Sequence, residues 1–195
     1  MLANILKGKN VILASGSPRR QAFFKELDLE YTIDVREVNE TFDPTLIGSA
    51  IPDYLAQLKA SVFTDLKAND ILITSDTIVW YRGEALNKPA DAQEAFQMIS
   101  SLSGNTHEVI TSVCFTTATQ QITVNDTTKV TFKKLTREEI EYYIANFKPY
   151  DKAGGYGIQE WFGYIAVTHI EGSYFNVMGL PTHKVYETLS KLAIS

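Results

Sequence analysis

VILASGSPRR, at residues 11–20, joins a short apolar run to the start of a helix. Val11–Leu13 is typical of a strand. Ser17 is a good helix N-cap, and Pro18 suits the first helical position because its missing N–H would be unpaired there anyway. This stretch therefore predicts a strand, a tight glycine-containing turn and a helix.

The same stretch carries two arginines in the first turn of the predicted helix. Arg20 stands where a capping box places Glu or Gln, and Arg19 lies beside it. Two cations there oppose the helix dipole, which favours anions. With the hydroxyls of Ser15 and Ser17, they suit a bound phosphate chain. A capped surface helix with solvated arginines is an equally balanced alternative.

The composition indicates a globular protein without a broad basic surface. The chain has 195 residues, 45% hydrophobic and 21% charged, with a formal net charge of -5. One large domain or two small lobes fit this length. Nucleic-acid polymers are unexpected partners, because they usually require a basic face.

The cysteine content, the apolar runs and the N-terminal sequence together predict the cellular location of the protein. Cys114 is the single cysteine and lies between apolar neighbours, as expected for a buried thiol in a reducing compartment. No apolar run reaches the roughly 18 to 20 residues of a membrane span, and no secretory signal is recognisable. We expect a cytoplasmic protein that does not enter membranes.

Alternating strand and helix patterns predict a mixed, twisted α/β sheet flanked by helices. The predicted strands are Asn10–Ala14, Tyr31–Val35, Ile71–Tyr81, Glu108–Thr117, Ile122–Phe132 and Gly163–Ile170. The predicted helices are Pro18–Leu27, Pro52–Leu66, Ala92–Leu102, Arg137–Phe147 and Pro181–Leu192.

Charged residues near element ends are candidates for chemistry, each with a structural alternative. Asp76 follows an apolar run and suits a base or metal ligand, or a turn-forming aspartate. Lys59 lies beside an apolar helix stripe, where a lysine usually extends its head group to solvent. Lys88 is held extended by the following proline. Glu40 lies in a long polar loop and is otherwise a solvated charge.

Eight short motifs occur in the order found in the Maf family, from about residue 11 to residue 189. They are SGSPRR at 15–20, Glu40, LKA at 58–60, SDTIV at 75–79, NKP at 87–89, SGNTH at 103–107, DKAGGYGIQ at 151–159 and NVMGLP at 176–181. Each is weak alone. Together they make the chain resemble this family over nearly its whole length.

The resemblance implies a fold similar to the inosine triphosphatase-like enzymes, with residues 1–195 forming a single domain of two lobes around a cleft. It also implies hydrolysis of a nucleoside triphosphate to a monophosphate and pyrophosphate, with a divalent metal, Mg²⁺ or Mn²⁺. Members of the family are often homodimers. The expected partner is thus the nucleotide substrate.

Roles carry over to matching positions. Asp76 is the expected general base and, with Glu40, the expected metal ligand. The residues expected to bind substrate are Ser15, Ser17, Arg19, Arg20, Lys59, Thr77, Lys88 and Gln159. Two carboxylates and four cations suit a metal-bound triphosphate.

Gln159 favours the branch of the family that acts on dTTP and UTP, since the branch acting on 7-methyl-GTP carries glutamate there. An amide offers a donor and an acceptor, matching N3–H and a carbonyl of thymine or uracil. Glu160 and Trp161 depart from the glycine that the family usually has after Gln159. A 7-methyl-GTP pyrophosphatase and a non-catalytic nucleotide-binding regulator of septum formation remain alternatives; the retained Asp76 and Glu40 speak against the regulator.

Overall fold

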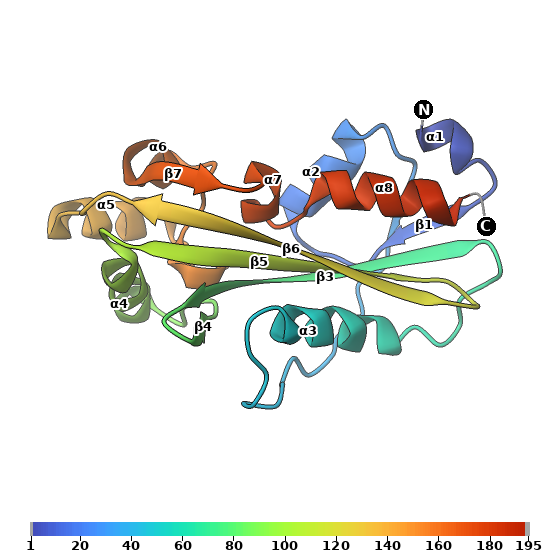
Figure 1. The fold of residues 1–195 in the computed structure, drawn as a ribbon, viewed down its shortest axis with the longest axis horizontal. Helices are drawn as coiled ribbons and strands as arrows, with labels where there is room; N and C mark the ends of the chain where they lie inside the picture. The colour runs from blue at the N-terminus through green and yellow to red at the C-terminus, as the bar shows by residue number, and fades with distance from the viewer. Residues whose placement is uncertain (1, 194–195) are drawn as a thin grey trace. The chain divides into compact units, whose positions relative to one another are not determined.

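The computed structural model describes residues 2–193 and contains a mixed seven-stranded sheet flanked by helices (Figure 1). The strand order is β2 (Thr32–Ile33), β1 (Asn10–Leu13), β3 (Asp70–Tyr81), β5 (Thr106–Thr116), β6 (Gln121–Phe132) and β7 (Val167–Glu171), with β4 (Glu84–Leu86) paired to β3. β1 runs parallel to β2 and β3, whereas β7 is antiparallel to β6. The predicted mixed α/β fold is confirmed.

The described chain divides into two compact units. The first comprises residues 2–76, 111–126 and 179–193, and the second comprises residues 77–110 and 127–178. Strands β3, β5 and β6 contribute residues to both. The single-domain organisation and the cleft expected from the family resemblance stay predictions.

The first unit packs helices on both faces of its strands. Figure 1 shows α3 (Ala50–Ser61) on one face and α2 (Pro18–Glu26) and α8 (Thr182–Leu192) on the other, with α1 (Leu2–Ile5) in contact with α8. Buried side chains between α3 and the sheet include Ala56, Ala60, Phe63, Leu72 and Cys114. Cys114 is thus a buried free thiol, as predicted.

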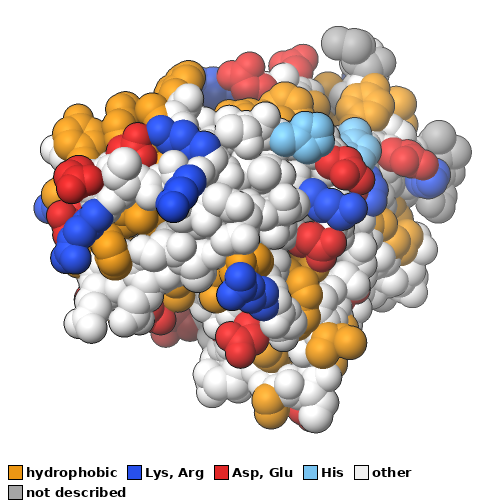
Figure 2. Space-filling model, turned by 60° about the vertical axis from the view of Figure 1, so that its left-hand side comes forward, with side chains coloured by type: hydrophobic (Ala, Val, Ile, Leu, Met, Phe, Trp, Pro, Cys, Tyr) orange, Lys and Arg blue, Asp and Glu red, His pale blue; other side chains and the backbone are white. Residues whose placement is uncertain are grey.

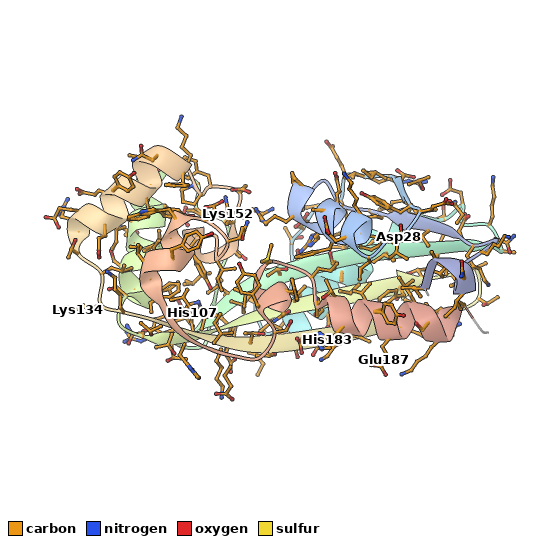
Figure 3. The ribbon with its side chains drawn as sticks, turned by 90° about the horizontal axis from the view of Figure 1, so that it is seen from above. Asp28, His107, Lys134, Lys152, His183 and Glu187 are labelled. Carbon is orange, nitrogen blue, oxygen red and sulfur yellow. The ribbon has the colours of Figure 1, made fainter. Side chains whose placement is uncertain are left out.

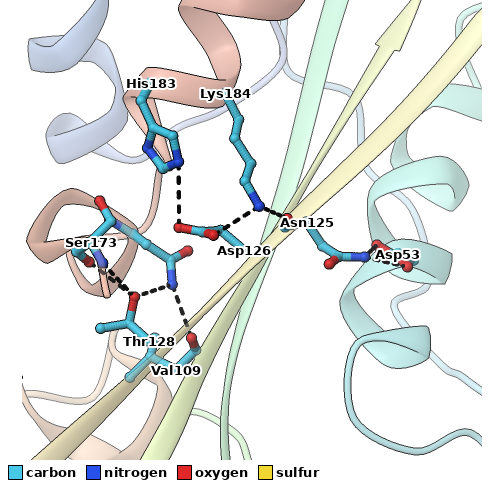
Figure 4. A network of polar contacts seen from close by, with 9 residues as sticks. Asp53, Val109, Asn125, Asp126, Thr128, Ser173, His183 and Lys184 are labelled. Atoms are coloured by element: carbon cyan, nitrogen blue, oxygen red, sulfur yellow. Dashed lines mark hydrogen bonds and ion pairs between the residues drawn. The ribbon is translucent and has the colours of Figure 1, made fainter. Parts of the chain in front are cut away.

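Polar contacts fix α8 and α3 to strand β6 (Figure 4). The Lys184 ammonium of α8 donates to Asp126 Oδ1 at 2.8 Å and to the Asn125 carbonyl at 2.6 Å. The Asn125 amide in turn donates to Asp53 Oδ2 at 3.0 Å. These charge-assisted contacts anchor both helices to the same segment of β6.

The second unit is built around aromatic side chains. Its helices are α4 (Ala92–Leu102), α5 (Arg137–Phe147), η1 (Ala153–Gly155), α6 (Trp161–Ala166) and α7 (Tyr174–Val177). Phe132 meets Tyr156 and Phe162 edge to face. His107 (Figure 3) lies 2.7 Å through Nε2 from Tyr156 Oη, and burial lowers its pKa to about 4. His107 is therefore neutral at pH 7 and is a buried residue of this unit's core.

Three predicted elements differ from those observed. The second predicted helix ends at Ser61 rather than Leu66. The predicted strand Gly163–Ile170 begins as helix α6, and only Val167–Glu171 is extended. The predicted strand Tyr31–Val35 is shorter in the structure, where only Thr32–Ile33 pairs in the sheet. The predicted helices Ala92–Leu102 and Arg137–Phe147 are confirmed to the residue.

Within residues 2–193, no helix is long and apolar enough to cross a membrane. On the face shown in Figure 2, lysine and arginine side chains lie singly or in small groups among acidic ones. A mixture of acidic and basic side chains is expected for a chain whose net charge is only -5.

Candidate active site

Two carboxylates converge on one lysine in the first unit. Lys59 projects from α3, and its Nζ lies 2.6 Å from Asp76 Oδ1 on β3 and 3.3 Å from Glu40 Oε2 in the long loop before α3. The Asp76 side chain is 13% exposed and that of Lys59 18%, so this pair is poorly hydrated, whereas Glu40 is 46% exposed. Poor hydration strengthens each electrostatic interaction at Asp76.

Arg20 stands next to this cluster. Its Nε donates to the Gly179 carbonyl at 2.8 Å and its Nη1 to the Ser75 carbonyl at 3.2 Å. Loss of hydration lowers the pKa of Arg20, while the fields of Asp76 and Glu40 oppose that effect. The guanidinium therefore stays charged beside Asp76 and also ties α2 to β3 and to the residue that leads into α8.

The turn between β1 and α2 is arranged as the sequence predicts, with one difference. Ser17 has the extended backbone of an N-cap, but its side chain makes no capping hydrogen bond with the helix. Its N–H instead donates to Ser15 Oγ at 3.3 Å. Arg19 is half-buried in the first turn of α2. Ser17 is thus the N-cap residue, as predicted, and its own N–H is held by Ser15 Oγ.

The remaining predicted substrate residues belong to the second unit. Thr77 is half-buried on β3 and follows Asp76 directly. Lys88 is exposed between β4 and α4, and Gln159 is half-buried in the turn closed by the Glu160 N–H and the Gly157 carbonyl at 3.2 Å. The structure brings Arg20, Glu40, Lys59 and Asp76 together in the first unit. Thr77, Lys88 and Gln159 all belong to the second unit.

Glu40 and Asp76 suit a divalent cation whose other ligands would be water and substrate phosphates. Among the described residues, no group of three or more His, Cys, Asp and Glu side chains is arranged to hold a metal ion. Mg²⁺ is commonly bound by one or two carboxylates together with water and substrate phosphates. Both carboxylates pair with the Lys59 ammonium, so their surroundings suit a cation electrostatically.

Sequence reasoning missed a polar network in the second unit. Lys152, 7% exposed, lies 3.0 Å through Nζ from Glu160 Oε1, and Tyr143 Oη donates to Glu160 Oε2 at 2.5 Å. Glu160 stands out in the sequence as a departure from the family motif. Its partners are not visible there because Tyr143 comes from α5, on a separate element.

Comparisons with known proteins agree with the motif resemblance. The family described as "Maf-like protein" matches residues 10–192. A dTTP/UTP pyrophosphatase of Flavobacterium johnsoniae is 61% identical over 193 residues, covering 98% of this chain and all of that protein. Proteins with the same name from Christiangramia forsetii and Phocaeicola vulgatus are 59% and 47% identical, each again over 98% of this chain.

Among solved structures, a HAM1 protein from Coxiella burnetii aligns with 94% of this chain and 99% of its own, at 12% identity and a TM-score of 0.47. The assignment rests on the family match and on the relatives rather than on this distant likeness. Since the family covers residues 10–192 and the relatives cover nearly the full length, the chain belongs to the Maf family.

Proposed function

We propose that this protein hydrolyses dTTP and UTP to the nucleoside monophosphate and pyrophosphate. The observation that carries the proposal is the convergence of Glu40 and Asp76 on Lys59, with Arg20 alongside. This combination of anions and cations suits a metal-bound triphosphate. The full-length similarity to proteins named dTTP/UTP pyrophosphatase supports the same reaction.

The cationic side chains in this proposal bind and orient the phosphates. Lys59 and Arg20 are poorly hydrated, so contacts with phosphate oxygens replace water at little cost. Arg19 and the N-terminus of α2 add donors to the same anion. As negative charge shifts onto the departing pyrophosphate, fixed cations stabilise it more than they stabilise the substrate.

Asp76 in this proposal accepts the proton of the attacking water. Its carboxylate is held by Lys59 at 2.6 Å and placed by the regular backbone of β3, so its position is fixed before substrate binds. Glu40 and Asp76 would hold a Mg²⁺ or Mn²⁺ ion, which would offset phosphate charge and acidify bound water. Lys59 would then transfer its contacts from the carboxylates to a phosphate.

The setting of the reaction is part of the proposal. Cys114 is free and buried, as is common for proteins of a reducing compartment, and we place the activity in the cytoplasm. We also propose a homodimer, on the resemblance to the family alone. Light scattering of the purified protein measures the oligomeric state directly.

A panel of nucleotides tests the proposed activity. Pyrophosphate release should be fastest for dTTP and UTP and slower for CTP, GTP and 7-methyl-GTP, and it should stop when a chelator removes divalent ions and return with Mg²⁺ or Mn²⁺. Fastest turnover of 7-methyl-GTP would move the protein to the other branch of the family. No release from any nucleotide would refute the proposal.

Gln159→Glu is expected to weaken activity on dTTP and UTP selectively. A carboxylate still accepts from N3–H but faces a base carbonyl without a donor, and such an unpaired contact costs roughly 1 to 3 kcal/mol, about a 5- to 150-fold loss in kcat/KM. The measurement is kcat/KM for dTTP, UTP, CTP and 7-methyl-GTP on both proteins, with a melting curve for each.

Gln57→Glu is the matched control, since it makes the same change on the exposed Gln57 of α3, whose Nε2 donates to Thr123 Oγ1 at 2.9 Å. It should leave all four kcat/KM values unchanged. An equal loss on every nucleotide in Gln159→Glu would show that Gln159 braces its loop and does not read the base.

A further inference from the structure

A closed ring of hydrogen bonds surrounds the turn that carries Gln159. The Glu160 N–H donates to the Gly157 carbonyl at 3.2 Å, and the Gly157 N–H donates to Tyr143 Oη at 3.0 Å. Tyr143 Oη donates to Glu160 Oε2 at 2.5 Å. Because Glu160 is the last residue of the turn, this hydrogen bond closes the ring. The phenol uses both its donor and its acceptor capacity in this ring.

The direction of these hydrogen bonds is fixed by charge. Burial and the neighbouring Glu160 carboxylate raise the pKa of Tyr143, so the phenol keeps its proton and donates it to Glu160. The acceptor of the Gly157 N–H is then the phenol oxygen. Removing the Tyr143 hydroxyl therefore opens the ring, and removing the Glu160 charge weakens it.

Lys152, labelled in Figure 3, makes a second contact with the same Glu160 carboxylate. Its ammonium lies 3.0 Å from Glu160 Oε1 and 2.7 Å from Asp151 Oδ1. A lysine that is only 7% exposed must be paired, and Asp151 is 61% exposed. Glu160, 22% exposed, is thus the better-shielded anion for this lysine.

Steric contact links the glycine of the turn to Glu160. A Cβ added at Gly157 would lie 2.7 Å from Glu160 Cδ and 3.0 Å from Lys152 Cε, both too close for carbon atoms. Gly157 has no positive φ, so the close approach of these two side-chain ends, rather than backbone conformation, favours glycine here. The Glu160 carboxylate therefore lies directly over the turn whose third residue is Gln159.

We propose that Glu160 is a positioning residue for base recognition, acting through the Tyr143–Gly157 contact and Lys152 to hold Gln159 in one orientation. This inference rests on the proposed function, because it assigns a cause to the base preference of that site. Glu160 itself does not touch the base. In this chain Glu160, the centre of the network, stands where the family usually has a glycine after Gln159.

Two variants test the role through different atoms of the ring. Glu160→Gln removes the charge that holds Lys152, and Tyr143→Phe removes the hydroxyl that joins Gly157 to Glu160. Each should raise KM for dTTP and UTP roughly 10-fold, because a charge-assisted contact is lost. The kcat should stay within about 2-fold, and kcat/KM for CTP should not change, since Asp76 and the phosphate contacts are intact.

Matched controls come from the same unit. Glu139→Gln weakens a comparable ion pair, in which Lys133 Nζ donates to Glu139 Oε1 at 2.7 Å, and glutamine preserves the capping box. Tyr81→Phe removes a buried hydroxyl that has no hydrogen-bond partner within the described part of the chain. Both controls should keep the wild-type ratio of kcat/KM for dTTP over CTP.

The ratio of kcat/KM for dTTP over CTP decides the outcome. A fall of roughly 10-fold in both test variants and in neither control supports the positioning role. An unchanged ratio in active variants overturns it, as does an equal loss on both nucleotides with a lowered melting temperature. If Glu160→Gln does not fold, Tyr143→Phe alone decides. Wild-type protein that releases no pyrophosphate overturns the proposed function and this inference together.

Discussion

Asp76→Asn is expected to lower kcat for pyrophosphate release from dTTP by roughly 10²- to 10⁴-fold, the usual cost of losing a general base. Asparagine has nearly the same shape but cannot take a proton from water and binds a divalent ion less well. Nucleotide binding should remain measurable, because Lys59 and Arg20 are unchanged. Single-turnover kinetics and a separate titration with dTTP measure the two effects.

Asp70→Asn is the control for this variant, on the same strand. Asp70 is 7% exposed, and its carboxylate accepts from Asn10 Nδ2 at 3.0 Å and from the Lys67 N–H at 2.8 Å. These contacts are structural, so this change should lower the melting temperature and leave kcat near the wild-type value. Near-normal turnover in Asp76→Asn would show that Asp76 is structural as well.

Lys59→Met is expected to lower kcat/KM by roughly 10- to 150-fold, which corresponds to a charged hydrogen bond of about 1.5 to 3 kcal/mol. Methionine keeps much of the apolar stem but removes the ammonium shared by Glu40 and Asp76. The two carboxylates then lack their common cation. Mn²⁺ should therefore bind the nucleotide-free variant more tightly than the wild type, which calorimetry measures.

Lys184→Met is the control for Lys59→Met. Lys184 forms a similar pair with Asp126 at 2.8 Å in the same unit but is not among the predicted site residues. It should change stability and leave kcat/KM and Mn²⁺ affinity unaltered. Weaker Mn²⁺ binding in Lys59→Met would contradict the assignment of Glu40 and Asp76 as a shared cation site.

Helix limits were predictable where the signals are local. Thr136 accepts from the Glu139 N–H at 3.3 Å, and the Glu139 carboxylate accepts from the Thr136 N–H at 2.9 Å, which is the full capping box. Both residues lie three positions apart in the sequence. The start of α5 could therefore be located from the sequence without any knowledge of the fold.

The end of α3 depends on Arg36, a residue that lies well before this helix in the sequence. Arg36 donates to the Val62 carbonyl at 3.2 Å, pairs with Asp65 at 2.7 Å and lies over the Phe63 ring at 4.1 Å. These contacts hold the segment after Ser61 out of the helix. The apolar stripe that continues to Leu66 gives no sign of them, so the predicted helix was too long.

Helix α6 also depends on contacts that the sequence pattern does not reveal. Residues 161–166 include three aromatic residues and a glycine among apolar neighbours, which favours a strand on local grounds. The Gly163 N–H instead donates to the Glu160 carbonyl at 2.9 Å, and a Cβ at Gly163 would lie 1.7 Å from the Ile158 carbonyl. Packing of this turn against residues 157–160 therefore decides its conformation.

The candidate site was predictable as a set of residues and less so as a set of contacts. The order of motifs in the sequence points to Glu40, Lys59 and Asp76, and the structure brings these three side chains together. The motifs do not reveal that Arg20 donates to the backbone carbonyls of Ser75 and Gly179, because carbonyl partners carry no residue signature.

The products formed from dTTP test the central proposal most directly. Wild-type protein with Mg²⁺ should convert dTTP into dTMP and pyrophosphate in equal amounts, separable by ion-exchange chromatography, with no orthophosphate formed in the absence of an added pyrophosphatase. This result follows if the bond between the α and β phosphates is broken. Formation of dTDP with orthophosphate would contradict the account.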